Sequence, residues 1–215
     1  MNLISTLARA MGSSWVSGIR LYATVATLGL LGRFAHLRLP GELEVLTNGW
    51  VIGIASGLFV VEFFADKIPY LDSTWDVAHT FIRIPAGAVL AAAAFGDFDR
   101  RVQVVALLVG GGLALSAHGT KAAARAAVNL SPEPFSNIVV SLVEDAVAVV
   151  SIVLTIFLPI ALIVLVTGFV VLSLFLLPKI IRLMRRGFGR VRRATERHFP
   201  QSRNDAKSKE LRAKS

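Results

Sequence analysis

The sequence predicts an all-α membrane protein, a polytopic helix bundle of about six spans followed by a basic tail. Three observations support this class. Hydrophobic residues make up 54% of the 215 residues and charged residues only 17%, whereas about a quarter of a soluble domain is charged. Apolar runs near the 20 residues needed to cross a bilayer recur along the chain. The net charge of +9 is concentrated after residue 178, where 13 Lys and Arg outnumber 3 Asp and Glu.

The first predicted span covers residues 13–35 and contains Arg20. Two interpretations of this arginine are open. Its long side chain reaches interfacial water if the span begins late, or the helix is broken near Gly18 and the guanidinium points into the bundle. A polar loop at residues 36–47 follows, with Glu42 and Glu44.

The second predicted span, residues 49–67, presents small residues at helical spacing, which allows another helix to approach closely. These are Gly49, Gly53, Ser56 and Gly57. Pro69 ends this span, and residues 70–76 form a polar turn. The third span, residues 77–95, then carries His79 and Arg83.

The fourth predicted span runs over residues 102–128 and ends at a break with two prolines, residues 129–134. The next 44 residues, 135–178, are almost all apolar and would measure about 66 Å as one helix. A single helix of that length is too long for one bilayer crossing. We therefore divide the run near Pro159 into a fifth and a sixth span.

Beyond this bundle, residues 1–178, we expect a basic amphipathic segment at residues 179–200 and a disordered tail at residues 201–215. The segment is expected to contact anionic lipid headgroups rather than nucleic acid, because residues 1–178 have a net charge of only −1. The positive-inside rule places it in the cytoplasm, at a plasma membrane of bacterial type. Six spans would put the N-terminus on the same side, and no cleaved signal peptide is expected.

Charged residues inside these spans are the main functional signal. Each costs roughly 2.5–3.5 kcal/mol at a helix centre, so it usually faces a bundle interior or a water-filled cavity and has partners. Glu62 and Asp66 lie one turn apart with Lys67 beside them, and Glu144 and Asp145 lie inside the fifth span. We predict that these groups meet in one polar site.

A weak internal repeat supports that arrangement. An offset of 54 residues places Gly57 on Gly111 and Lys67 on Lys121, and a polar turn follows both segments. Spans two to three and four to five would then be two similar hairpins, as in some transporters. Chance similarity between two apolar helices is the competing explanation.

At the same residues the chain resembles a family of multi-span membrane proteins, domain of unknown function 4126. The resemblance lies in residues 66–72, 83–87, 118–132 and 144–145 and covers most of the chain before the tail. It implies a multi-span fold and no particular activity or substrate.

The residues predicted to bind a substrate are Glu62, Asp66, Lys67, Asp72, Arg83, His118, Lys121, Arg125, Asn129, Glu144 and Asp145. Grouped cations would favour an anion, and unpaired acids would favour a proton or a metal cation. A metal site of His118 with Glu144 and Asp145 has no supporting histidine spacing. The chain has no cysteine, no Gly-x-Ser-x-Gly and no phosphate-binding loop, so we expect no cofactor and no enzyme, lipid-phosphate chemistry being the enzymatic alternative.

The leading hypothesis is therefore a small transporter or channel-like protein that moves an ion or a small anionic solute. The competing hypothesis is a scaffold or lipid-interacting protein whose buried charges are structural ion pairs that hold one helix register. A homo-oligomer is expected only if the pathway is wide.

Overall fold

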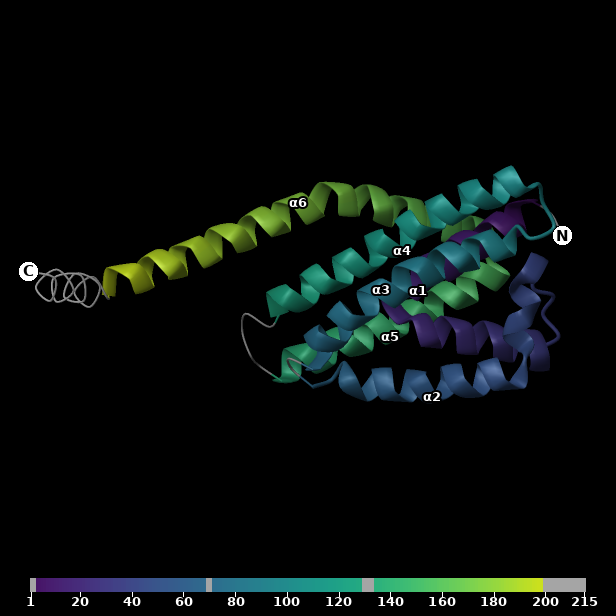
Figure 1. Ribbon diagram of the computed structural model, residues 1–215, viewed down its shortest axis with the longest axis horizontal. Coiled ribbons are helices and arrows are strands. Elements are labelled where there is room, and N and C mark those ends of the chain that lie inside the picture. Colours follow the sequence, from purple (N-terminus) through teal and green to yellow (C-terminus); the bar gives the residue numbers. More distant parts are fainter. Residues whose placement is uncertain (1–2, 69–70, 129–133, 199–215) are drawn as a thin grey trace, which may run out of the picture. The chain divides into compact units, whose positions relative to one another are not determined.

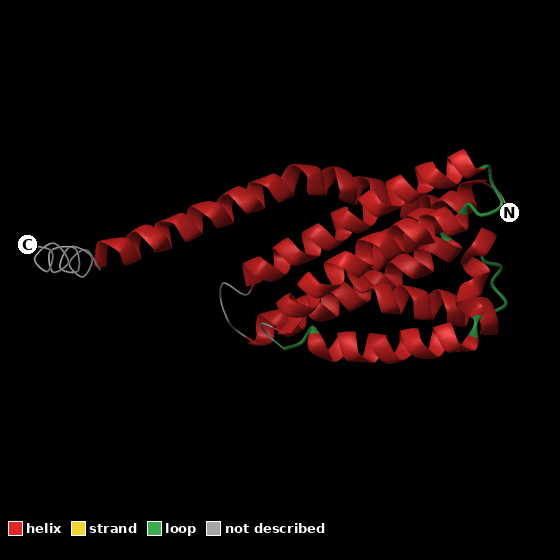
Figure 2. Cartoon of the chain, viewed as in Figure 1, coloured by secondary structure: helices red, strands yellow, loops and turns green. Residues whose placement is uncertain are grey.

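A computed structural model describes residues 3–68, 71–128 and 134–198, and these residues form helices and connecting loops only (Figure 2). The all-α prediction is confirmed. The elements are α1 (Leu3–Phe34), the 3-10 helix η1 (Gly41–Thr47), α2 (Gly49–Ala65), α3 (Leu71–Ala94), α4 (Arg100–Val128), α5 (Pro134–Phe157) and α6 (Pro159–His198). The chain divides into two compact units, Met1–Leu174 and Phe175–Ser215.

Local chemistry explains where several helices begin and end. The Asn48 side chain accepts a hydrogen bond from the Trp50 amide at 2.9 Å and caps α2. The predicted division of the long apolar run is confirmed, because α5 ends at Phe157 and α6 begins at Pro159. Proline suits a first helical position, where its missing N–H has no partner within the helix.

Two predicted connections are more ordered than expected. The turn predicted at residues 70–76 is helical from Leu71 onward, so α3 begins six residues before the predicted third span. The predicted loop at residues 36–47 contains η1, whose Leu43 and Leu46 are buried. In η1 the two leucines pack inward, whereas at the start of α3 the inward side chains are Asp72 and Asp76, which are buried against Arg125 and Arg83.

Helix α1 folds back on itself at Arg20, whose φ of −142° and ψ of 79° are not helical. A straight helix would separate Arg9 from Phe34 by about 37 Å. Instead, the Arg9 guanidinium donates a hydrogen bond to the carbonyl of Arg38, just beyond the helix. The two arms, residues 3–19 and 21–34, therefore enter and leave at the same end of the bundle, as the purple ribbon in Figure 1 shows.

The α1 hairpin forms the centre of the first unit, and α2 to α5 pack around it. These helices alternate in direction, so one end of the unit carries the loop at residues 95–99 and the other carries the residues that follow α2 (Figure 1). We call these the α3–α4 end and the α2–α3 end. The tip of the hairpin points toward the α2–α3 end, and its arms fill the other half.

Two apolar clusters hold the arms in place. One gathers Trp15, Val16 and Ile19 of the first arm with Leu113 of α4 and Leu162 of α6. The other joins the second arm, at Leu21 and Leu28, to η1 and the end of α3. At Gly18 a Cβ atom would lie only 2.4 Å from the carbonyl oxygen of Ala114, so glycine permits the close approach of α1 to α4.

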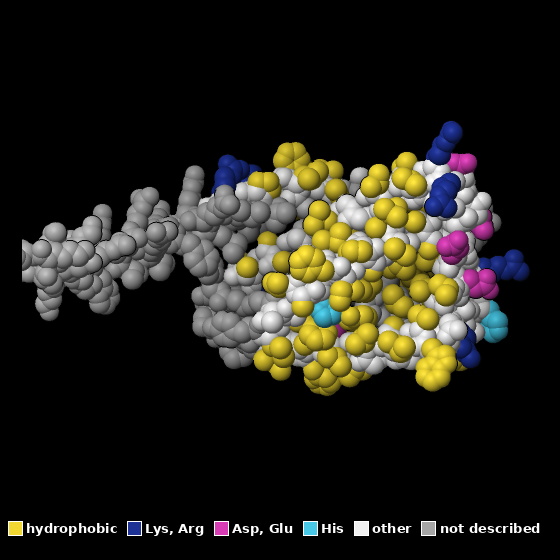
Figure 3. Space-filling model, viewed as in Figure 1, with side chains coloured by type: hydrophobic (Ala, Val, Ile, Leu, Met, Phe, Trp, Pro, Cys, Tyr) yellow, Lys and Arg dark blue, Asp and Glu magenta, His cyan; other side chains and the backbone are white. Residues whose placement is uncertain are grey.

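The outer surface is that of a membrane protein. Five described helices are long and apolar enough to cross a bilayer, and η1 with α2, which meet at 73°, would add a sixth. Figure 3 shows a broad apolar surface on one face, with charged side chains gathered at the α3–α4 end. The prediction of a multi-span protein is confirmed, although α1 is folded back rather than one straight crossing.

Two predictions about helix packing are not confirmed: the close approach of a helix to the small residues of α2, and the pairing of helices in two similar hairpins. Within the described residues, nothing lies within 4 Å of a Cβ added at Gly53 or Gly57, so no helix packs closely on α2 at these two glycines, whereas at Gly49 the Arg33 side chain of α1 lies 3.0 Å away. The two helices of each predicted hairpin pack mainly on other helices, with α3 against α4 and α1. The internal repeat therefore stays a prediction.

The second unit begins inside α6, which continues through Pro178 as far as His198. Arg182 is exposed, and its Nε donates to the carbonyl of Pro178 at 3.2 Å. The amphipathic character predicted for residues 179–200 stays a prediction, and the predicted disordered tail lies outside the described residues.

Candidate functional site

Five helices contribute charged side chains to one buried cluster near the tip of the α1 hairpin, which we call the charge network. Its cations are Arg20, Lys67, Arg83, Lys121 and Arg125, and its acids are Glu62, Asp66, Asp72, Asp76, Glu144 and Asp145. Only Lys67, Glu144 and Asp145 expose more than 10% of their side chains. The prediction that these groups from separate spans gather is confirmed.

Asp66 is the most connected acid of the network. It follows the last residue of α2, and its carboxylate pairs with Arg20 and, at 3.1 Å, with the Lys121 ammonium. Its backbone carbonyl accepts from Arg125 at 2.7 Å and from the Asn137 amide at 3.3 Å. These donors satisfy a helix end that would otherwise leave carbonyl groups unpaired in an apolar environment.

Arg20 reaches this site because α1 folds back. Its side chain is fully buried, so the alternative in which it extends to interfacial water is wrong. Besides Asp66 it lies 2.9 Å from the Asp145 carboxylate and donates to the Ser141 hydroxyl at 3.2 Å. The broken-helix alternative is confirmed, and the break places a guanidinium at the hairpin tip.

Glu144 of α5 is surrounded by cations. Arg125 binds it through two hydrogen bonds, from Nε to Oε1 at 3.0 Å and from a terminal nitrogen to Oε2 at 2.7 Å. The same oxygen, Oε2, lies 3.6 Å from a terminal nitrogen of Arg20 and 3.6 Å from the Lys121 ammonium. Three cations therefore converge on one carboxylate oxygen.

Arg83 forms a second branch. Its guanidinium pairs with Glu62 and, at 2.7 Å, with Asp76. Lys121 joins this branch to the first, because its ammonium lies 3.1 Å from both Asp76 and Asp66. Among the described ion pairs, Lys121 is therefore the residue that links the two branches.

The two histidines of the spans have hydrogen-bond partners. His118 bonds the Thr80 hydroxyl at 2.7 Å and lies 3.4 Å from Arg83. His79 stacks on Trp75, with ring centroids 4.3 Å apart, and bonds Tyr22 at 3.0 Å. Among the described residues no group of three or more His, Cys, Asp or Glu side chains could hold a metal ion, so His118 with Glu144 and Asp145 does not form such a group.

Ten of the eleven predicted site residues lie in or against the network, and Asn129 lies outside the described residues. Sequence reasoning did not assign Asp76, Asn137 or Ser141 to the site. Asp76 lies seven residues before Arg83, which is two helical turns on one face. That spacing could have identified it. The side chains of Asn137 and Ser141 gave no comparable signal.

Several buried carboxylate oxygens have no hydrogen-bond partner among the described residues. They are Glu62 Oε2, Asp66 Oδ1, Asp76 Oδ2 and both carboxylate oxygens of Asp145. A buried acceptor without a partner is unfavourable by about 1–3 kcal/mol. The network therefore retains capacity to accept a proton, a water or a donor group of a ligand.

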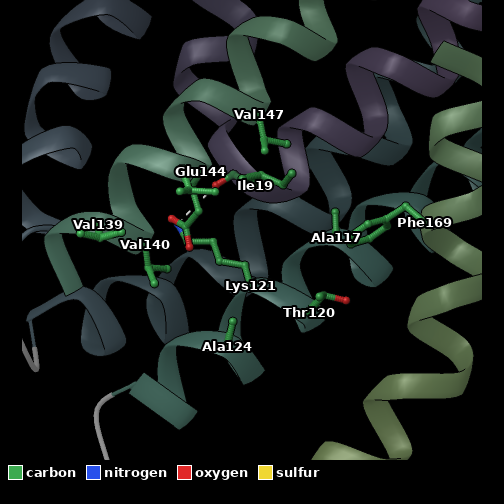
Figure 4. A pocket seen from close by; sticks show the side chains of 11 residues that line it. Ile19, Ala117, Thr120, Lys121, Ala124, Val139, Val140, Glu144, Val147 and Phe169 are labelled. Atoms are coloured by element: carbon green, nitrogen blue, oxygen red, sulfur yellow. Dashed lines mark hydrogen bonds and ion pairs between the residues drawn. The ribbon is translucent and has the colours of Figure 1, made fainter. Parts of the chain in front are cut away.

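A cavity of about 260 Å³ reaches the network from the side (Figure 4). Its lining comes from α1, α4, α5 and α6: Ile19, Ala117, Thr120, Lys121, Ala124, Val139, Val140, Val143, Glu144, Val147 and Phe169. Lys121 and Glu144 point toward one another in this view and supply its charged groups. The cavity thus joins an apolar wall to the oxygen on which three cations converge.

The family model of domain of unknown function 4126 matches residues 7–179. The chain belongs to the DUF4126 family. The match includes η1, α2 to α5, most of α1 and the first half of α6, together with every residue of the charge network. Neither the curated proteins nor the solved structures contain a match to the chain. Membership of DUF4126 therefore agrees with the multi-span fold and assigns no activity.

Proposed function

We propose that this DUF4126 protein is a small transporter that takes up one proton together with one anion at Glu144. The observation that carries the proposal is that Arg20, Lys121 and Arg125 converge on Glu144 Oε2 at the wall of a cavity. The same three cations surround Asp66 Oδ2, but Asp66 is fully buried and does not line that cavity. Glu144 occupies the position that an oxyanion would take. It is also among the least buried acids of the network and lies in the cavity.

Replacement of the Glu144 carboxylate by a bound oxyanion keeps the charge of the site constant. In the resting site six carboxylates face five cations. A proton that binds Glu144 removes one negative charge and weakens its attraction to the three cations around it, which keep their pairs with Asp66. A monovalent oxyanion that then binds those cations restores the original balance. The anion alone would add a second excess negative charge to the site, and an uncompensated buried charge is strongly unfavourable. The anion therefore binds only when Glu144 is protonated.

Arg125 is the group best suited to hold the incoming anion. Its planar fork binds two oxygens of Glu144 at once, and it would bind a carboxylate, phosphate or sulfonate in the same way. Lys121 would contribute a point charge from the same helix. After the anion is released and Glu144 loses its proton, the Glu144 carboxylate would pair again with Arg125 and Lys121.

The test uses purified protein in liposomes that contain a pH-sensitive dye. The probes are inorganic phosphate and methanesulfonate, which leak slowly through lipid as anions. The expected result is internal acidification that depends on the added anion, with about one proton for each anion. If neither probe moves protons in the wild-type protein, the transport proposal is wrong.

Two variants assign the roles. Lys121→Met should reduce anion-dependent acidification to that of protein-free liposomes, whereas the same change at exposed Lys179 should leave the rate unaltered. Glu144→Gln should still move the anion but without its proton, so that the flux carries current. Methanesulfonate is the deciding probe here, because it carries no proton of its own at neutral pH, whereas the monovalent phosphate ion releases one. Acidification that persists in Glu144→Gln with methanesulfonate would contradict the assignment of the proton site.

A scaffold is the second candidate, favoured by the observation that every charge of the network has an opposite charge within 4.0 Å. In that case Lys121→Met lowers the unfolding temperature in detergent, and no probe is moved by any variant. A basic segment after Pro178 that binds anionic lipid is compatible with both candidates.

We also infer an orientation. The positive-inside rule places the basic segment after Pro178 in the cytoplasm at a plasma membrane. The expectation of a cytoplasmic N-terminus assumed six complete crossings. Because α1 enters and leaves at one end, α2 to α6 supply five. An odd number supports an N-terminus on the opposite side.

A further inference from the structure

The cavity beside Glu144 has two apolar walls and a charged floor. On α4 the lining residues Ala117, Thr120 and Ala124 follow one face of the helix, and on α5 the lining residues include Val139 and Val143. The floor lies where Lys121 meets Glu144. A molecule that fits both parts needs an apolar body and a charged end.

The cavity opens sideways, toward lipid. Val139 and Val143 are 42% and 56% exposed, and Ala124 is exposed on the facing helix. Helices α4 and α5 make few contacts with each other, because both pack on the α1 hairpin. These helices are candidate membrane spans, so side chains exposed along them face hydrocarbon. The mouth between α4 and α5 is therefore reached from within the bilayer.

The charge at the floor selects the sign of the ligand head. Three cations converge on Glu144, so an oxyanion can replace that carboxylate, whereas an ammonium head would meet Arg125, Arg20 and Lys121. The size limits the tail. About 260 Å³ is slightly below the 300–1,000 Å³ typical of drug-sized ligands, which suits one head and part of a single alkyl chain.

We propose that the ligand of this site is an anionic amphiphile, an oxyanion head on one alkyl chain that enters between α4 and α5 from the bilayer. This inference rests on the proposed function, because it takes the exchange with Glu144 as the way the head is bound. The alkyl chain lies along Val139 and Val143 and extends into lipid. Phe169 of α6 closes the far side of the cavity.

The test is photolabelling of the wild-type protein in lipid nanodiscs. The probe is a twelve-carbon alkyl sulfonate with a photoreactive diazirine in its chain, and labelled peptides are mapped by mass spectrometry. Labelling is expected on residues 117–124 and 139–147. Unlabelled dodecanesulfonate at about ten times its Kd should reduce it about tenfold by mass action. Dodecyltrimethylammonium should not reduce it.

Two tryptophan variants test the location. Ala124→Trp fills the mouth and should lower the labelling about tenfold. Leu115→Trp introduces the same side chain at a lipid-exposed position of α4 outside the cavity and should leave the labelling unchanged. The competition experiment with unlabelled dodecanesulfonate uses the wild-type protein, so its result does not depend on how well either variant folds.

The outcomes separate this inference from the proposed function. Proton-coupled movement of phosphate or methanesulfonate without labelling of the two helices would overturn the amphiphile alone. Labelling that requires the sulfonate head, without any anion-dependent acidification, would overturn transport and keep the ligand class. Equal competition by the sulfonate and the trimethylammonium amphiphile would mean that ordinary lipid fills the cavity, and the inference would be wrong.

Discussion

Removal of the Arg83 charge should destabilise the protein more than removal of the Arg20 charge. Arg83→Met leaves the fully buried Glu62 without the cation that pairs with it. Arg20→Met leaves Asp66 paired with Lys121, at 3.1 Å. Breaking a buried pair so that one charge is stranded costs about 3–5 kcal/mol, and we assign that full amount to Arg83→Met. Arg20→Met should cost less.

A double variant tests the cause. Arg83→Met combined with Glu62→Gln removes the stranded charge and should recover about half or more of the lost free energy of unfolding, because replacing both members of a buried pair is often nearly neutral. The assay is unfolding in mixed dodecylmaltoside–SDS micelles, followed by helical circular dichroism. A double variant as unstable as Arg83→Met would refute the reasoning, since the loss would then come from packing.

Three further predictions concern the hairpin and the network. Gly18→Ala should lower the free energy of unfolding by about 1–3 kcal/mol, because its Cβ would lie 2.4 Å from the Ala114 carbonyl oxygen, whereas Gly53→Ala, with nothing within 4 Å, should be neutral or gain up to about 1 kcal/mol in the same assay. Arg125→Lys should cost about 1–3 kcal/mol, since an ammonium cannot reproduce the two-point contact with Glu144, and equal stability would contradict it. Epitope tags at the two ends of the chain should be accessible to antibody from opposite sides of sealed vesicles, and same-side labelling would disprove the count of five crossings.

Much of the site could be predicted from the sequence because a charge in a long apolar run has few alternatives to burial with a partner. Glu62, Lys121 and Glu144 stand out from their neighbours in this way, and the structure brings them into one network. Asp76 was missed for the opposite reason. It stands among other polar residues, and only its helical position within α3 aligns it with Arg83.

The path of α1 could be predicted only in part. The charge of Arg20 next to Gly18 indicates a break, but a run of this length and composition is equally compatible with one straight crossing. What decides the fold-back is a set of tertiary contacts, such as Arg9 with Arg38, between residues 29 positions apart. Local periodicity carries no information on such pairs.

The fold-back also has a mechanical consequence. Both arms of α1 begin or end at the α3–α4 end of the bundle. The tip of the hairpin, at the opposite end of the arms, is held by the ion pairs of Arg20. Neutralising Asp66 and Asp145 would leave Arg20 with the Glu144 pair and would also weaken the contacts of Lys121 and Arg125 on α4. The hairpin that fills half of the bundle is thus held along its arms by apolar packing and at its tip by ion pairs, and the residue at which the backbone reverses is the one that forms those pairs.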